Sequence, residues 1–464
     1  MSAYSAAREY RGRRVLVAGA GVSGVPVAEA LLAAGAEVTV VDRRTSDALE
    51  RLEAAGARVL LGATEVPAGT QEVVTSPGWR PDHPLLAGAG VEVYSEPELA
   101  WRMRGPDAAP WLAVTGTNGK TTTVTMLASI LRAAGLRTAA VGNIGTPLLT
   151  AALDPSYDVL AVELSSFQLH WSSTLAPRAG VVLNLADDHL DWHGGRDAYA
   201  GAKTAVWRGN AVAVGNADDA RVTGLLAGSG APRTASFTLG TPRPGELGVV
   251  EDLLVDRAFV ADAAHAAEEL GTLAEVRPPG PHNVANALAA AALARAHGVP
   301  AAAVRAGLAG YTPEPHRNAR VAEVGGVTYV DDSKATNPHA ALASLLSYPR
   351  VVWVAGGLFK GVDTDDLART VAPRLAGAVL LGAERDLLAQ ALARHAPDVP
   401  VIDVAATDDG AMVEVVEAAA RLAVPGDVVL LAPAAASLDM FRGYAHRGES
   451  FAAAVRDLAV RTGS

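Results

Sequence analysis

The sequence predicts an α/β protein built from three α/β domains, and three observations support that class. Short β-branched runs alternate with Ala- and Leu-rich helical stretches almost throughout the 464 residues, which is typical of parallel sheets covered by helices. Two glycine-rich loops each follow a β-like run and precede a helical stretch. The proline-containing segments RGPDAAP and YTPEP interrupt the pattern. We therefore expect domains over residues 1–107, 108–313 and 314–464, the first and third Rossmann-like and the central one of the P-loop ATPase type.

Composition excludes several functional classes. The chain has no cysteine, so it has no disulfide, no thiolate metal site and no cysteine nucleophile. Its formal net charge of −11 argues against non-specific binding of nucleic acid, which needs a broad basic face. No apolar stretch reaches the roughly 18 residues of a membrane span, and the first residues lack the apolar segment of a signal peptide. We expect a cytoplasmic monomer that binds neither nucleic acid nor membranes.

The first domain opens with LVAGAGVSG, in which Gly19 to Gly24 match the pattern G-x-G-x-x-G. A β-like run precedes these glycines, and a second run, EVTVVD, ends in the acidic Asp42. This is the outline of a dinucleotide-binding fold, in which the loop and the N-terminus of the next helix hold a pyrophosphate. The pattern alone leaves the ligand open between NAD and something else.

The second glycine loop is the most informative segment. The strand-like WLAVT runs into Gly116–Thr122, with the sequence GTNGKTT, and an apolar helical pattern follows. Glycines let backbone N–H groups curl around phosphate oxygens, Lys120 would reach the β- and γ-phosphates, and the Thr121 hydroxyl would bind Mg²⁺. The usual P-loop has glycine where this chain has Val114. A plain turn with a solvated Lys120 is the alternative, but because strand, loop, Lys-Thr and helix occur in order we predict a P-loop.

Two further strand ends carry candidate metal ligands. Glu163 is the last residue of the strand-like part of DVLAVEL, and ligands of open α/β sheets bind at such strand ends. Glu163 could therefore complete a Mg²⁺ site with Thr121. Alternatively, it is an ordinary charged residue at the end of a strand. The next strand leads into ADDHLDWHGG, which contains His189 and His193 but lacks a zinc-site pattern, and a solvated acidic loop would also fit. Lys203 follows, and as an ammonium it offers only a salt bridge or a phosphate contact.

The loop TGTNGKTT resembles the variant P-loop of the Mur ligase and folylpolyglutamate synthase superfamily. Further segments resemble Mur ligases across the whole chain: GNIGTPL, ELSSFQL, PHNVANALAA, HRNARV, VDDSKATNP, GGLFKGVD and APAAASLDMFRGYAHRGESF. Members of the superfamily use ATP to join an amino acid to a carboxylate through an acyl phosphate. The resemblance implies the addition of D-glutamate to UDP-N-acetylmuramoyl-L-alanine in peptidoglycan precursor synthesis, with ATP as third substrate and two Mg²⁺ ions as cofactors.

The resemblance also implies roles that spacing does not. The family pattern N-x-x-x-D-H-L-D…K corresponds to His189 and Lys203 in this chain. By this resemblance, His189 would bind a second Mg²⁺. Lys203 would be carbamylated by CO₂, which would turn it into an anionic oxygen ligand. With Lys120 and Glu163 these residues form the expected catalytic set. The expected metal ligands are Thr121, Glu163, His189 and Lys203.

The expected ATP site combines the P-loop with polar residues of later segments. Asn283 and Asn286 carry amides that could bind the adenine edge, although N-capping is the simpler role. The fork of Arg317 suits phosphate, and an exposed arginine is the default otherwise. Asp332 could hold the ribose. The full expected set is Thr115, Gly116, Thr117, Asn118, Gly119, Lys120, Thr121, Thr122, Asn283, Asn286, Arg317, Asp332 and Lys334.

Two further sites follow from the resemblance. The first domain takes the uridine diphosphate of the substrate, since a helix N-terminus that accepts the pyrophosphate of NAD can accept this one. The expected UDP-substrate residues are Val22, Ser23, Asp42, Arg43, Arg44, Ser76, Pro77, Gly78 and Asn143. D-glutamate presents two carboxylates, so its site needs donors and positive charge. The family match supplies Thr336, Lys360, Ser437 and Tyr444, with a surface lysine as the alternative for Lys360.

The match departs from the usual family pattern in the amino-acid pocket, and three other interpretations stay open. Tyr444 stands where relatives often carry Phe, and Leu358-Phe359 replaces a pair that is often Gly-Asp. The chain could be a ligase that adds another amino acid to a UDP-muramoyl peptide or to folate. It could also be an NAD-dependent dehydrogenase, which would leave the P-loop and the third domain without a purpose, or a non-catalytic regulator that binds UDP-sugar or ATP.

Overall fold

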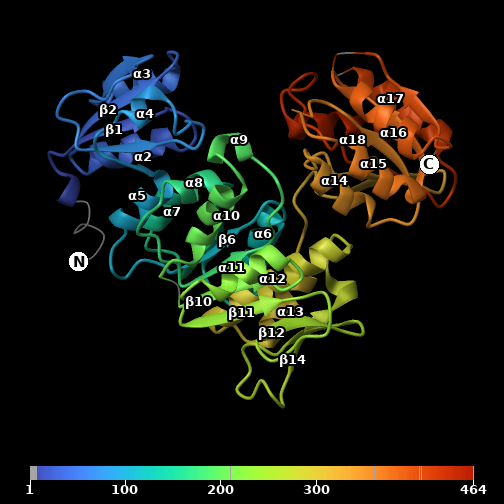
Figure 1. Cartoon of the computed structure of the whole chain (residues 1–464), viewed down its shortest axis with the longest axis horizontal. Helices are drawn as coiled ribbons and strands as arrows, with labels where there is room; N and C mark the ends of the chain where they lie inside the picture. The colour runs from blue at the N-terminus through green and yellow to red at the C-terminus, as the bar shows by residue number, and fades with distance from the viewer. Residues whose placement is uncertain (1–7, 210, 360, 407, 409, 463–464) are drawn as a thin grey trace. The chain divides into compact units, whose positions relative to one another are not determined.

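Three β-sheets, each with its own helices, make up the protein in the computed structural model (Figure 1). The residues described are 8–209, 211–359, 361–406, 408 and 410–462. By its contacts the chain forms two compact units, and the first two sheets lie in one unit while the third lies in the other. The units are Met1–Val276 with Ala285–Tyr311, and Arg277–Val284 with Thr312–Ser464. In the described part of the chain, no helix combines the length and the apolarity that crossing a bilayer requires.

Five parallel strands form the first sheet: β1 Arg14–Ala18, β2 Glu37–Asp42, β3 Arg58–Leu61, β4 Glu72–Thr75 and β5 Glu92–Ser95. Their order is β3-β2-β1-β4-β5. The central strand β1 buries four consecutive apolar residues, as expected where both faces of a parallel sheet are covered. The order reverses at β1, so the glycine loop that follows it lies at the usual ligand position of a doubly wound fold.

Nine strands form the second sheet: β6 Trp111–Thr115, β7 Thr138–Gly142, β8 Val159–Glu163, β9 Ala179–Val182, β10 Val212–Asn216, β11 Arg233–Phe237, β12 Glu246–Val250, β13 Leu253–Asp256 and β14 Glu268–Thr272. Their order is β14-β13-β12-β11-β10-β9-β6-β8-β7. β8 and β9 both pair with β6 in parallel. The loops that follow these three strands therefore open at one edge of the sheet.

Six strands form the third sheet: β15 Ala319–Val324, β16 Val327–Asp331, β17 Val351–Ala355, β18 Leu375–Leu380, β19 Val401–Asp403 and β20 Val428–Leu431. Their order is β15-β16-β20-β17-β18-β19. Only β15 runs antiparallel to its neighbour. The turn that joins it to β16 consists of Gly325 and Gly326, both with positive φ (58° and 77°), as a two-residue hairpin of type I′ requires.

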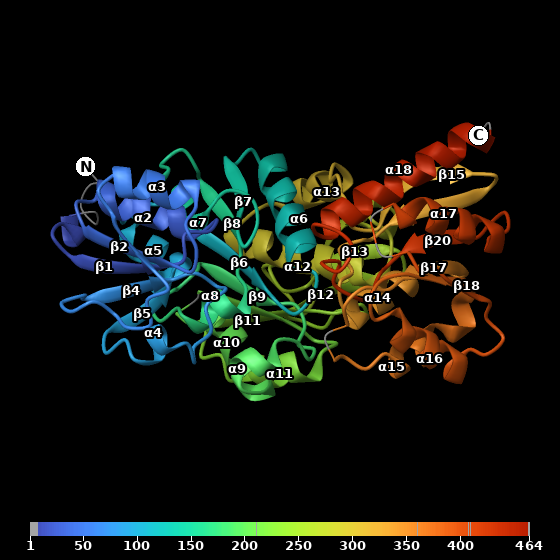
Figure 2. The same ribbon diagram turned by 90° about the horizontal axis from the view of Figure 1, so that it is seen from above.

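Helices cover both faces of the sheets. The P-loop helix α6 packs against β6, β7 and β8, and in the third sheet α17 and α18 cover one face while α14, α15 and α16 cover the other (Figure 2). The α-helices are α2 Gly24–Ala33, α3 Asp47–Ala54, α4 Pro84–Ala87, α5 Glu96–Met103, α6 Lys120–Ala133, α7 Leu148–Leu153, α8 Ser166–His170, α9 Leu190–His193, α10 Arg196–Thr204, α11 Ala220–Ala227, α12 Pro281–His297, α13 Ala301–Ala309, α14 Pro338–Leu345, α15 Asp365–Val371, α16 Arg385–His395, α17 Ala411–Leu422 and α18 Tyr444–Thr462. The 3₁₀ helices are η1 Arg8–Tyr10, η2 Ala205–Trp207, η3 Leu273–Glu275 and η4 Ala372–Arg374.

The predicted α/β class is confirmed, with one difference in strand direction. The alternation of strands and helices predicts parallel sheets, and most strands are parallel, but β13 and β15 run antiparallel to their neighbours. β12 and β13, like β15 and β16, are joined by two residues only, and so short a link can form a hairpin but not a helical crossover. The limits of the three domains at residues 107/108 and 313/314 stay predictions.

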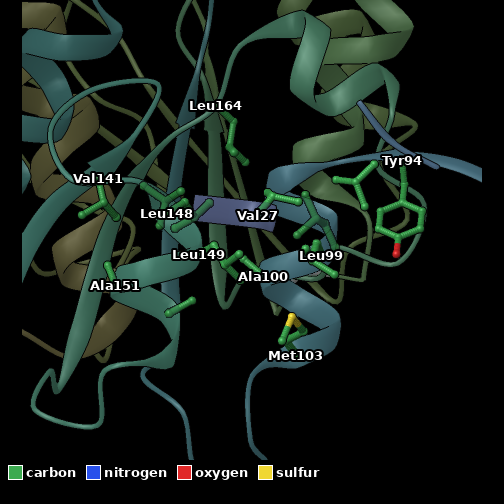
Figure 3. Close-up of a cluster of buried hydrophobic side chains, with 14 of the residues drawn as sticks. Val27, Tyr94, Leu99, Ala100, Met103, Val141, Leu148, Leu149, Ala151 and Leu164 are labelled. Carbon is green, nitrogen blue, oxygen red and sulfur yellow. The ribbon is translucent and has the colours of Figure 1, made fainter. Parts of the chain in front are cut away.

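An apolar cluster joins α5, at the end of the first sheet, to α7 of the second. Leu99 and Ala100 of α5 lie beside Leu148 and Leu149 of α7 within this cluster (Figure 3). The carboxylate of Glu98 on α5 is fully buried nearby. It accepts hydrogen bonds from the backbone of Ser173 and Thr174, from the Thr174 hydroxyl at 2.6 Å and from Arg102 at 2.9 Å. Apolar packing and a buried carboxylate thus act together at this joint.

Replacing Glu98 is expected to lower stability in a pH-dependent way. Burial opposes its ionisation, but the hydrogen bonds from Thr174 and Arg102 outweigh burial and hold the pKa of Glu98 below its usual value of 4.5. A depressed pKa stabilises the folded state above the unfolded-state pKa, and this contribution is lost as the pH falls through the folded-state pKa. We expect Glu98→Gln to cost about 1–3 kcal/mol at neutral pH, seen as a lower Tm.

The same substitution at Glu92 is the control. Glu92 also bonds Arg102, but its side chain is half exposed, so Glu92→Gln should cost less than about 1 kcal/mol. The Tm difference between the Glu98 variant and the unmodified chain should shrink as the pH falls below 4.5 and through the lower pKa of the folded state. A difference that stayed constant through that range would contradict the assignment.

Candidate active site

The predicted P-loop lies between the end of β6 and the start of α6. Gly119, the residue before α6, has a φ of 85°, and a Cβ there would overlap the Oδ1 of Asn286, so glycine is required at this turn. The first N–H groups of the 14-residue helix and the positive end of its dipole point into the loop. The loop therefore has the backbone shape and the polarity of a phosphate-binding site.

Asn184, two residues after β9, holds the P-loop from one side. Its Oδ1 accepts a hydrogen bond from the Asn118 N–H at 2.9 Å, and its Nδ2 donates to the Asn118 carbonyl at 3.1 Å. Its own carbonyl accepts from the Thr117 N–H at 3.0 Å. The Thr117 hydroxyl lies 2.9 Å from the Tyr199 hydroxyl on α10. Sequence reasoning missed this role of Asn184, and the asparagine of the N-x-x-x-D-H pattern was the available signal.

Two lysines converge on one carbonyl of the P-loop. The Nζ of Lys120 donates to the carbonyls of Gly116 and Thr117 at 2.9 and 2.8 Å, and the Nζ of Lys203 donates to Gly116 at 2.7 Å. Lys203 is only 2% exposed, and its Nζ lies 4.7 Å from the centroid of the Tyr199 ring. Burial, reinforced by the charge of Lys120, holds the pKa of Lys203 well below its usual value. The structure thus brings the two predicted catalytic lysines together and favours the neutral amine of Lys203.

Glu163 flanks the P-loop on the other side, at the end of β8. One carboxylate oxygen accepts from the Thr121 hydroxyl at 2.8 Å and the other from the Asn143 side chain at 2.9 Å. The carboxylate is 1% exposed. Asn143, predicted for the UDP substrate, therefore lies at the second sheet beside the predicted metal ligand, whereas the other residues predicted for that substrate lie at the first sheet.

His189 lies on the loop after β9, one residue before α9. Its backbone has a φ of 52°, and its Nε2 lies 3.4 Å from a carboxylate oxygen of Asp188. Burial lowers the pKa of His189, and the positive charge of Lys120 acts in the same direction, whereas the charge of Asp188 opposes the shift. His193, on α9, is buried instead, with its Nε2 3.0 Å from the Ser166 hydroxyl, and burial lowers its pKa to about 4. Within the described residues, no three His, Asp or Glu side chains lie close enough to hold a metal unaided.

The glycine loop after β1 is held by Asp42, at the end of β2. Asp42 accepts from the Ala20 N–H at 2.8 Å and from the Arg43 N–H at 2.6 Å. Ser76, which follows β4, donates its N–H to the Ala18 carbonyl at 3.0 Å. Eight of the residues predicted for the UDP substrate therefore gather at the carboxyl ends of three neighbouring strands: Val22, Ser23, Asp42, Arg43, Arg44, Ser76, Pro77 and Gly78.

In the other compact unit, several predicted residues lie on the loop after β16. Asp332 accepts from the Asn318 N–H at 3.0 Å, and burial raises the pKa of Asp332 to about 6 although the charge of Arg317 opposes the rise. The Nζ of Lys334 lies 3.7 Å from the centroid of the Tyr444 ring, a cation–π distance. Basic, acidic and aromatic groups thus meet at one edge of the third sheet.

The remaining predicted residues of this unit are dispersed over three segments. Thr336 donates its N–H to the carbonyl of Lys334 at 2.8 Å, and Ser437, on the loop after β20, is buried. Asn283 is buried in the first turn of α12. Lys360 lies outside the described residues.

Arg447, on α18, is a second group that sequence reasoning missed. It is 1% exposed, and its guanidinium donates to the Ser333 hydroxyl at 3.0 Å, to the Ser333 carbonyl at 2.9 Å and to the Ala435 carbonyl at 3.1 Å. Burial lowers the pKa of Arg447 to about 10. The side chain joins the loop that carries Lys334 to the loop that carries Ser437, and no local pattern distinguishes it from a surface arginine.

Lysine is rare in this chain and occurs only at predicted site positions. Among the 39 Lys and Arg residues there are four lysines, Lys120, Lys203, Lys334 and Lys360. Arginine cannot replace a compact ammonium, nor an amine that must lose its proton, whereas it can replace lysine in ordinary surface ion pairs. The composition therefore agrees with special chemistry at these four positions.

Comparison with known proteins identifies the family. The model of the Mur ligase middle domain matches residues 114–294, and that of the Mur ligase, glutamate ligase domain, matches residues 316–435. The UDP-N-acetylmuramoylalanine--D-glutamate ligase of Thermobifida fusca is 61% identical, with 97% of this chain and 100% of the relative covered. The chain belongs to the Mur ligase family. The ligase of the same name from Streptomyces coelicolor is 58% identical over 97% of this Mur ligase and 99% of the relative.

Solved structures agree on the fold. The MurF of Acinetobacter baumannii is 19% identical to this Mur ligase, with a TM-score of 0.61 over 97% of the chain and 92% of the relative. The UDP-N-acetylmuramate-alanine ligase MurC of Thermotoga maritima is 18% identical, with a TM-score of 0.59 over 96% of this chain and 99% of the relative. The model of the pyridine nucleotide-disulphide oxidoreductases also matches residues 14–65, which agrees with a Rossmann-like first sheet.

Removing the Asn184 side chain should weaken nucleotide binding more than folding. Asn184→Ala deletes the two side-chain hydrogen bonds to Asn118, so the P-loop loses its fixed shape, and we expect the KM for ATP to rise about tenfold. Asn216 at the end of β10 is the matched control, because its side chain also donates to a carbonyl, that of Leu183, and accepts from the Asp218 N–H. Asn216→Ala should lower the Tm similarly and leave the KM for ATP unchanged. Equal KM values in both variants would contradict the role of Asn184.

Proposed function

We propose that this Mur ligase uses ATP to add D-glutamate to UDP-N-acetylmuramoyl-L-alanine, a step of peptidoglycan precursor synthesis. The 61% identity to a ligase of that name, over that protein's whole length, carries the proposal. The P-loop beside two lysines and a buried carboxylate supplies a site suited to phosphoryl transfer.

The proposed reaction has two steps. A carboxylate oxygen of the L-alanyl group attacks the γ-phosphorus of ATP, and ADP leaves, which forms an acyl phosphate. The amine of D-glutamate then attacks the acyl carbon. The tetrahedral adduct loses phosphate, and the amine loses a proton as the amide forms. Both steps build negative charge on oxygen, so fixed positive groups lower the barrier.

In the first step, the P-loop provides the fixed positive groups. Its backbone N–H groups and the N-terminus of α6 would hold the phosphates, and Lys120, whose Nζ lies at the loop carbonyls, would contact the transferring phosphoryl group. Asn184 would keep the loop in this shape. The carbonyl of Gly116 would hold Lys203 at the same edge of the sheet.

The residues beside the P-loop fit Mg²⁺. The Thr121 hydroxyl and the Glu163 carboxylate are oxygen donors 2.8 Å apart, and Mg²⁺ prefers oxygen ligands and completes its shell with phosphates and water. When bound, Mg²⁺ would neutralise part of the charge on the β- and γ-phosphates. We propose Thr121 and Glu163 for one ion, and His189 with a carbamylated Lys203 for a second.

The other two substrates are proposed to bind at the remaining clusters of predicted residues. The glycine loop, held by Asp42, would take the uridine diphosphate at the N-terminus of α2. Thr336, Lys360, Ser437 and Tyr444 would take D-glutamate, and Arg317, Asp332 and Lys334 would contact ATP. Asn143 would contact the UDP substrate near Glu163.

A direct assay of the product tests the proposed function. The purified chain with ATP, Mg²⁺, UDP-N-acetylmuramoyl-L-alanine and D-glutamate should form the D-glutamyl product, seen by mass spectrometry, with one phosphate released per amide. Lys120→Ala should lower the rate at least about 100-fold, because the charge on the transferring phosphoryl group loses its ammonium partner. A product formed only with L-glutamate, L-alanine or meso-diaminopimelate would refute the choice of D-glutamate.

Carbamylation of Lys203 has a spectroscopic test. A carbamate forms from the neutral amine, which burial favours at this position. With ¹³C-labelled bicarbonate the chain should show a carbamate carbonyl resonance. Lys203→Arg keeps a cation but cannot form a carbamate, so it should lose both the resonance and the ligase activity. A folded variant with full activity, or no resonance from the unmodified chain, would contradict the modification.

A further inference from the structure

The segment that carries Arg317 enters the third sheet through two residues with a left-handed backbone. His316 and Asn318, on either side of Arg317, have φ values of 62° and 51°. Residues with a side chain rarely adopt this region, although asparagine and histidine do so more often than most. Such conformations persist only where the surrounding structure holds them, and they are frequent at functional sites. The bend around Arg317 must therefore be held by its neighbours.

Two successive aspartates at the end of β16 hold this bend. The antiparallel pairing of β15 with β16 sets Ala319 opposite Asp331, so the residue before β15 meets the residue after β16. Asn318 accordingly donates its N–H to the Oδ1 of Asp332 at 3.0 Å. The Nδ1 of His316 lies 2.6 Å from the Oδ2 of Asp331, within hydrogen-bond distance. Both left-handed residues are thus bonded to the same strand end.

The hydroxyl of Tyr348 fixes the side chain of Asn318. Tyr348 lies between α14 and β17, and its hydroxyl donates to the Oδ1 of Asn318 at 2.6 Å. Burial raises the pKa of Tyr348 to about 12, so the hydroxyl keeps its proton and remains a donor at neutral pH. Asn318 is 7% exposed, and its Nδ2 has no hydrogen-bond partner within the described residues. The bond from Tyr348 therefore orients this buried amide.

We infer that Asn318, oriented by Tyr348, is a positioning residue that directs Arg317 toward the nucleotide. The inference rests on the proposed function, in which Arg317 contacts ATP. A guanidinium is a planar fork, and its paired hydrogen bonds to phosphate depend on direction as well as distance. A small change in the backbone of a long side chain displaces its end, so a bend that is held on both sides keeps the fork in place. A misplacement of about 1 Å can cost about 100-fold in rate.

The left-handed backbone separates the effects of two substitutions at Asn318. Asn318→Ala can keep the N–H bond to Asp332, but alanine disfavours a φ of 51°, and the contact with Tyr348 is lost. Glycine adopts this region readily, so Asn318→Gly keeps the bend although it loses the same contact. If the bend positions Arg317, glycine should be the better substitute. If Asn318 only fills space in the core, alanine should be the better one.

Gly325, in the turn at the other end of the same hairpin, provides a matched control. Its φ of 58° is close to that of Asn318, and a Cβ there would meet no atom within 4 Å. Gly325→Ala therefore forces an alanine into the same backbone region without a steric overlap. It should lower the Tm for the same reason as Asn318→Ala and leave the KM of ATP unchanged.

The experiment measures the Kd of ATP by titration calorimetry together with the KM values of the ligase reaction, in the full chain. Asn318→Ala should raise the Kd and the KM of ATP about tenfold and leave the KM of D-glutamate unchanged. Asn318→Gly and Tyr348→Phe should raise both ATP constants only about threefold. In an Arg317→Ala background none of these substitutions should have a further effect on ATP, because they act through that side chain.

Three outcomes would overturn the inference. They are ATP binding by Asn318→Gly that is no tighter than by Asn318→Ala, an undiminished effect of Asn318→Ala when Arg317 is absent, and an equal rise of the ATP Kd in Gly325→Ala. If Asn318→Ala does not fold, Tyr348→Phe takes its place, and its effect must likewise vanish without Arg317. Failure of the proposed function would appear differently, as ATP binding to the unmodified chain without D-glutamyl product, and the Kd comparison would still decide the role of Asn318.

Discussion

The backbone path of the P-loop is the constraint on which the rest of the candidate site depends. The carbonyl of Gly116 receives two amines, the peptide of Asn118 is held at both its N–H and its carbonyl, and α6 begins directly after Gly119. Because β8 and β9 flank β6 in a parallel sheet, the groups that follow those strands must meet this loop. The placement of Glu163 and Asn184 on opposite sides of it is a consequence of strand order.

Local patterns predicted the parts of the site that are continuous in sequence. The glycine loops, the strand ends and Glu163 could be located because a strand, a turn and a helix follow one another within about 25 residues. Asn184 could not be given a role, since that requires knowing that β9 lies beside β6. Arg447 acts on Ser333, 114 residues away in the sequence, and a buried arginine in a helix has no local signature. The general expectation of parallel sheets did not include the antiparallel strands β13 and β15, although Gly325-Gly326 between β-branched residues is a hairpin signal.

The two glycine loops show what such a motif does and does not specify. Both place backbone N–H groups at a helix N-terminus, which suits phosphate whatever molecule carries it. The first loop matches the fingerprint of NAD-binding proteins, and residues 14–65 match a family model of pyridine nucleotide oxidoreductases, yet the chain as a whole belongs to the Mur ligase family. The motif alone therefore does not identify the ligand, and the carboxylate of Asp42, which lies outside the loop, is bonded to the loop backbone at Ala20.

The scarcity of lysine makes the amines of this protein natural reporters. Reductive methylation with ¹³C-formaldehyde adds methyl groups to lysine and to the N-terminal amine but not to arginine. With four lysines, all at predicted ligand positions, the methyl spectrum would hold few signals, and each lysine signal would monitor a predicted site rather than the general surface. The buried Lys203 would react more slowly than an exposed amine and only as the free amine, so its reaction rate would record both solvent access to the phosphate site and the loss of a carbamate.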